Sequence, residues 1–218
     1  MSATDGPEKA GPDGAAAPVV GPIGPVNRIL AGWRDLRGSF RAEIAAGHQE
    51  PRLLAYAMGG CVALVLARAP QSVLGMLDGA AAAGEPVSAT MLVVMQVVAA
   101  LFFLPLMLYG VAALARMALR LFGGKGGWFD TRLAVFWSLV LAAPILLVGG
   151  LFSFGFALTN EAGRLAGLPS VIAQLIWLRF WAEGLAEAHA LRSGFPIFVA
   201  MAFAAAILAG AAQTAAPV

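Results

Sequence analysis

The stretch MLVVMQVVAALFFLPLMLYGVAALA, residues 91–115, decides the fold, because no charged residue occurs between Glu85 and Arg116. A helix rises 1.5 Å per residue, so roughly 20 apolar residues cross the ~30 Å hydrocarbon core of a bilayer. The whole chain is 60% hydrophobic and only 12% charged, which is too little charge to cover a soluble domain of this length. We therefore expect an all-α, polytopic helical membrane protein.

Four further apolar runs complete the predicted membrane domain, residues 51–213. They begin at Leu53, Leu133, Leu165 and Phe195. The run from Leu165 ends at Leu178, before Arg179, and is the shortest. Together with residues 91–115 these runs predict five transmembrane helices. A four-span alternative would omit the run from Leu165.

Lysine and arginine residues indicate the orientation of these spans. Six precede the first span, four lie in the second loop and two in the fourth, which places twelve on one side and only Arg68 and Arg164 on the other. The positive-inside rule then predicts a cytoplasmic N-terminus and an external or periplasmic C-terminus. This asymmetry favours five spans over four. The alanine- and glycine-rich composition suggests a GC-rich bacterial genome, and we therefore expect the membrane to be the bacterial cytoplasmic (inner) membrane.

The N-terminal segment has two parts. Residues 1–26 contain five prolines and five glycines between Gly6 and Pro25, which predicts a disordered Gly/Pro/Ala-rich cytoplasmic tail. This part lacks the basic start and apolar core of a signal peptide.

Residues 27–50 are predicted to form an amphipathic helix in the membrane interface. In NRILAGWRDLRGSF, residues 27–40, apolar side chains recur every three or four positions and arginines occupy the rest, a pattern typical of helices that bind anionic headgroups. The alternative is a cytosolic helix packed on the membrane domain. Candidate membrane-surface or lipid contacts, including three from the second loop, are Arg28, Trp33, Arg34, Arg37, Arg41, Arg116, Arg120 and Lys125.

The stretch IWLRFWAEGLAEAH, residues 176–189, supplies a candidate polar or partner-binding face. Arg179, Glu183 and Glu187 are spaced i, i+4 and i+8 and share one helical face, and His189 follows them. If the helix leaves the membrane near Arg179, the two glutamates lie in cytoplasmic water. The alternative places Arg179 and Glu183 inside the hydrocarbon, where an ionisable pair is expected to be functional.

The sequence carries no recognisable catalytic or metal-binding motif. It lacks Gly-x-Ser-x-Gly, His-Glu-x-x-His and paired intramembrane carboxylates. The loop RLFGGKGGWFDTR, residues 120–132, fails the phosphate-binding pattern and is expected to be a flexible turn. We therefore expect a protein that is not an enzyme, with no cofactor, no metal and no nucleic-acid partner.

Two segments resemble the Yip family, the domain named for Ypt/Rab-interacting proteins, and especially its short bacterial members. They are GGWFDTRLAVFWSLVLAAP, residues 126–144, and WLRFWAEGLAEAHAL, residues 177–191, and the resemblance covers roughly residues 27–212. It implies a non-enzymatic, multi-span membrane protein. Eukaryotic relatives associate with lipidated small GTPases through a longer N-terminal region that this tail does not match, so small-GTPase binding is not supported.

The expected function is that of an integral membrane scaffold or adaptor whose partners are membrane lipids, anionic ones above all, and other membrane or membrane-associated proteins. The alternative is a small solute or ion transporter or channel subunit. It would use Pro105 and Pro144, which interrupt two spans, together with the amides of Gln96 and Gln174. Under the first hypothesis the prolines only kink their helices, and the amides hydrogen-bond between helices.

Overall fold

The computed structural model describes residues 24–47, 49–84, 86–159 and 163–215, and these ranges fold into helices without any strand. The predicted tail, residues 1–26, lies almost entirely outside the described residues. The elements are α1 (Pro25–Arg34), α2 (Leu36–Ala45), α3 (Glu50–Ala83), α4 (Ala89–Val98), the π-helical turn η1 (Ala99–Phe103), α5 (Leu104–Leu121), α6 (Trp128–Leu158), the 3₁₀ turn η2 (Gly163–Gly167), α7 (Leu168–Ala188) and α8 (Phe195–Ala215).

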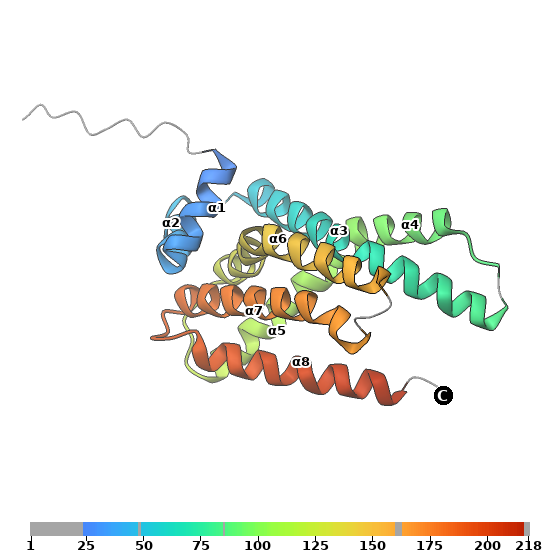
Figure 1. Cartoon of the computed structure of the whole chain (residues 1–218). Coiled ribbons are helices and arrows are strands. Elements are labelled where there is room, and N and C mark those ends of the chain that lie inside the picture. Colours follow the sequence, from blue (N-terminus) through green and yellow to red (C-terminus); the bar gives the residue numbers. More distant parts are fainter. Residues whose placement is uncertain (1–23, 48, 85, 160–162, 216–218) are drawn as a thin grey trace, which may run out of the picture.

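Helix α6 is the centre of the packing. It lies between α3 and α7 and also contacts α5, as Figure 1 shows. Its residues Val135, Phe136 and Leu139 are completely buried. A helix that is apolar on every side must be surrounded by other helices or by lipid. In this structure α3, α5 and α7 cover much of α6.

Four helical segments are long and apolar enough to cross a membrane: Glu50–Ala83, Ala89–Leu121, Trp128–Leu158 and Leu165–Ala188. Their length and composition indicate a multi-pass membrane protein. The weakest predicted span, which begins at Leu165, is among them. In helix α8 the apolar segment Phe195–Ala211 is shorter than these four segments and falls below the length needed to count as a span. The fifth span therefore stays a prediction.

The N-terminal amphipathic segment forms two helices, whereas a single helix over residues 27–50 was expected. Asp35 has a non-helical backbone (φ −135°, ψ 89°), and its carboxylate accepts a hydrogen bond from the Gly38 backbone N–H at 2.8 Å. An aspartate that caps a new helix in this way ends the previous one. The periodic apolar pattern continues across the break, which is why it does not reveal the break.

Helices α1 and α2 lie together at one end of the molecule (Figure 1). Helix α2 contacts α7 and α6, and α1 contacts α6. We call this end the charged end; it comprises α1, α2, the first turns of α3, α6 and α8, the last turns of α5 and α7, and the loops between them.

The two prolines within the spans have different local structures. Pro105 is the second residue of α5, separated by one residue from the π-helical turn η1, whereas Pro144 lies inside the continuous helix α6. The amide of Gln96 donates to the Ser72 hydroxyl at 2.6 Å. This bond joins α4 to α3, as expected for an amide that links helices.

Candidate functional site at the charged end

Helix α2 is held on α7 by arginine–glutamate pairs. Arg37 Nε lies 2.7 Å from Glu183 Oε2, and Arg41 Nε lies 2.9 Å from Glu187 Oε1. Arg179 also pairs with Glu183, one turn away on α7. The predicted shared face of Arg179, Glu183 and Glu187 therefore exists, but arginines from α2 cover it.

Burial distinguishes Glu183 from the solvated side chain that was expected. Glu183 is 7% exposed, and its carboxylate is shared between Arg37 and Arg179. A desolvated carboxylate requires such partners. The Arg37 guanidinium comes from a helix far away in the chain, so the spacing of residues along α7 carries no sign of this pair.

Close apolar packing adds to the contact between α2 and α7. Phe40 is completely buried, and a Cβ placed on Gly184 would lie 2.5 Å from the Phe40 ring. Position 184 therefore needs glycine for the aromatic ring to approach the α7 backbone. The ion pairs and this aromatic contact together make α2 a packed part of the molecule.

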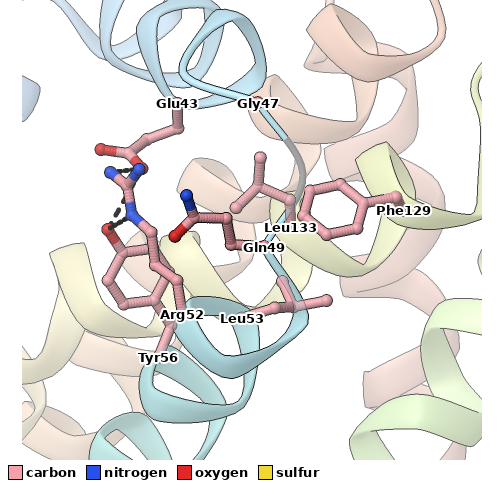
Figure 2. A pocket seen from close by; sticks show the side chains of 8 residues that line it. All are labelled: Glu43, Gly47, Gln49, Arg52, Leu53, Tyr56, Phe129 and Leu133. Atoms are coloured by element: carbon pink, nitrogen blue, oxygen red, sulfur yellow. Dashed lines mark hydrogen bonds and ion pairs between the residues drawn. The ribbon is translucent and has the colours of Figure 1, made fainter.

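A second polar network joins α2 to α3 around Glu43, which is 6% exposed. As Figure 2 shows, Arg52 lies between Glu43 and Tyr56; Arg52 Nη2 is 2.6 Å from Glu43 Oε2, and Arg52 Nε donates to the Tyr56 hydroxyl at 2.8 Å. Arg28 of α1 also pairs with Glu43. The adjoining cavity measures only about 10 Å³, space for about one water molecule, so this network fixes helices rather than binding a ligand.

Trp33 also has a structural contact. Its indole N–H donates to the Leu141 carbonyl of α6 at 2.9 Å, while its side chain is 41% exposed. The tryptophan thus attaches α1 to α6 and still presents part of its ring at the surface.

His189 fastens the loop between α5 and α6 to the end of α7. It is 1% exposed; its Nδ1 accepts from the Gly126 N–H at 3.1 Å, and its Nε2 lies 3.0 Å from the Thr131 hydroxyl. That hydroxyl donates to the Gly127 carbonyl at 2.8 Å, so Nε2 carries the proton that Thr131 accepts. The bond from Gly126 to Nδ1 requires a neutral imidazole.

The surroundings of His189 favour this neutral form. Burial lowers the pKa of His189 below its ordinary value, and the positive charge of Arg116 lowers it further; Asp130 opposes this effect and Arg120 adds to it. The loop expected to be a flexible turn is therefore attached to α7. Gly126 permits the attachment, since a Cβ there would lie 2.7 Å from the Ala188 carbonyl.

Arg116 is not available as a lipid contact on the outer surface. It is 7% exposed, and its guanidinium lies 4.1 Å from the centre of the Trp128 ring, a cation–π contact. By contrast Arg34, Arg120 and Lys125 are exposed. The set of candidate lipid contacts therefore divides into paired or covered arginines and exposed cations.

Sequence reasoning did not single out Glu43, Arg52, Tyr56 or Thr131. Each bonds to a residue on another helix or loop, and a single helix pattern carries no signal for such bonds. An acidic side chain among the arginines of an amphipathic segment was the one available sign for Glu43.

The arrangement stabilises contacts between elements. Among the described residues no group of three or more His, Cys, Asp or Glu side chains is placed to hold a metal ion. Glu43, Glu183 and Glu187 each face at least one guanidinium from another element.

No protein-family model, no curated protein and no solved structure matches this chain.

Proposed function

We propose that this chain is a non-enzymatic integral membrane scaffold or adaptor, similar to Yip-family proteins, whose charged end faces the cytoplasm. It would cross the bacterial cytoplasmic membrane five times, with the N-terminus inside. Its partners would be anionic lipids and other membrane or membrane-associated proteins, which it would organise or assemble.

One observation supports this proposal above all. The buried carboxylates at the charged end are paired with arginines of the same chain, while Arg34, Arg120, Lys125 and Arg192 are exposed at that end. Paired residues of this kind fix the surface on which they lie. The exposed cations give that surface the charge to attract phosphates or acidic protein segments.

Photo-crosslinking in native membranes tests the proposal. A photoreactive residue in place of Lys125 or Arg34 should capture the same neighbouring protein in repeated preparations. The matched control is Ser88, which is exposed. It lies beyond the last residue of α3, whereas the first turn of α3 belongs to the charged end. An adaptor role for the charged end would be contradicted if no neighbouring protein were captured reproducibly. It would also be contradicted if Ser88 and Lys125 captured the same set of proteins.

The transporter or channel hypothesis is a second candidate, favoured by the π-helical turn η1 before Pro105. Such turns occur often at functional sites within helices. Under this hypothesis, protein reconstituted in liposomes conducts ions or exchanges a solute, and replacing Pro105 by alanine changes the flux. Liposomes that remain as tight as protein-free ones would count against it.

A further inference from the structure

A large apolar groove runs between α5 and α8, and α7 forms its floor. Its volume is about 860 Å³, within the range of sites that hold one small molecule. Val111 and Phe122 mark its two ends on α5, Trp181 and Leu185 lie on the floor, and Met201 faces them from α8. Helix α8 contacts α7 among the described helices but not α5, which leaves the groove open between them.

The length of the groove matches half a bilayer. From Val111 to Phe122 the helix rises roughly 17 Å at 1.5 Å per residue. Half of the hydrocarbon core is about 15 Å. The groove is therefore about as long as one leaflet is deep, which is the length that one acyl chain occupies.

Only one end of the groove is polar. Arg192 and Ser193, in the connection from α7 to α8, line it there, at the charged end of the bundle. Phe122, the residue after the last turn of α5, lies at the same end. An amphiphile aligned with the groove would thus have its apolar part between α5 and α8 and its anionic part beside a guanidinium.

Trp181 adds an independent polar feature. It lines the groove and is 8% exposed, and its indole N–H is buried without an acceptor in the structure. A buried donor that lacks an acceptor destabilises the fold. Because this nitrogen is itself covered in the structure, a carbonyl oxygen at the ester end of a bound acyl chain would reach it only if neighbouring side chains moved.

We propose that this groove binds one acyl chain of an anionic membrane phospholipid, with the phosphate beside Arg192. The site shares Arg192 with the exposed cations of the proposed adaptor surface, but its apolar groove is separate from them and goes beyond that function. It would bind lipid whether or not the charged end recruits a protein.

Native mass spectrometry of the detergent-purified full chain tests the site, with phosphatidylglycerol and phosphatidylcholine of identical chains as probes. The wild type should bind one phosphatidylglycerol, at least fivefold more readily than phosphatidylcholine. Ala200→Trp, which fills the groove from α8, should reduce this binding at least fivefold. Ala118→Trp fills the groove from α5 and should reduce binding in the same way. It provides a second test if Ala200→Trp does not fold.

Two matched controls sharpen the result. Ala206→Trp, at an exposed position of α8 outside the groove lining, should bind lipid like the wild type. Arg192→Gln should abolish the preference for phosphatidylglycerol, whereas Lys125→Gln, also at the charged end, should keep it.

Several outcomes would overturn the proposal. The first is that both groove-filling variants bind lipid as well as the wild type. The second is that Ala206→Trp loses as much binding as Ala200→Trp. The third is that Arg192→Gln keeps the preference for phosphatidylglycerol. A lipid-free dimer that Ala200→Trp dissociates would assign the groove to a second copy of the chain. The crosslinking experiment at Lys125 is independent of these lipid-binding measurements. Failure of the lipid site and failure of the adaptor function can therefore be told apart.

Discussion

At the scale of single residues, His189 shows how a polar side chain that the sequence suggests for partner binding is used inside the molecule. Its two ring nitrogens join the glycine loop, Thr131 and the end of α7. The bond from Gly126 depends on the neutral ring, because a proton on Nδ1 would oppose the Gly126 N–H. The residue is therefore sensitive to pH although it is buried.

We predict that the thermal stability of the detergent-solubilised protein falls as the pH drops below about 6.5, the ordinary value of histidine. The pKa of His189 is lowered in the folded protein, so the unfolded chain takes up a proton first as the pH falls. Stability is thus complete above the ordinary pKa and is lost progressively towards the folded pKa. Unfolding temperatures measured from pH 8 to pH 5 provide the check.

Histidine variants isolate this contribution from that of the carboxylates. His189→Gln should be less stable than the wild type at pH 8 and should lose less stability on acidification. His48→Gln, which changes the other histidine of the chain, should retain the slope of the wild type. An identical pH slope in His189→Gln and the wild type would show that His189 does not titrate on unfolding.

At the scale of elements, α1 and α2 show the limits of an amphipathic pattern. The same spacing of apolar residues suits a membrane interface and a protein surface, because both are apolar on one side and wet on the other. The contacts of Phe40, Arg37 and Arg41 with α7 and its glutamates show protein packing on that side of α2. Leu30 of α1 remains 45% exposed, available for lipid.

Arg37→Ala should loosen α2 from α7. The substitution removes one of the two guanidinium groups at the buried Glu183, and hydrogen bonds to charged groups contribute about 1.5–3 kcal/mol. We expect backbone amides of α2 to exchange hydrogen about tenfold faster, which corresponds to about 1.4 kcal/mol. Hydrogen exchange read by mass spectrometry over residues 36–45 measures the effect.

Arg34→Ala is the matched control for Arg37→Ala. Arg34 is exposed on the neighbouring helix α1, so its removal should leave exchange in α2 within twofold of the wild type. If α2 exchanged hydrogen equally slowly in the wild type, Arg37→Ala and Arg34→Ala, the Arg37–Glu183 pair would contribute nothing to holding α2 on α7.

At the scale of the whole molecule, the distribution of basic residues predicts which end faces the cytoplasm. In a Cys61→Ala background, which removes the single native cysteine, Lys125→Cys and Arg192→Cys should react with an impermeant maleimide from the cytoplasmic side. Ser88→Cys and an epitope added after Val218 should be accessible from the external side. Labelling of position 192 and of the C-terminal epitope from one side would exclude a fifth crossing.

The sequence by itself determined the helical class, the four long apolar helices and the positions of the charged segments, because hydrophobicity and helical periodicity are local properties. It also placed Arg179, Glu183 and Glu187 on one face of α7. Only the tertiary structure decided that α2 covers this face, that Glu43 lies between Arg28 and Arg52, and that His189 holds the glycine loop. Those contacts join residues far apart in the chain, and their free energy depends on burial and geometry that no single helix possesses.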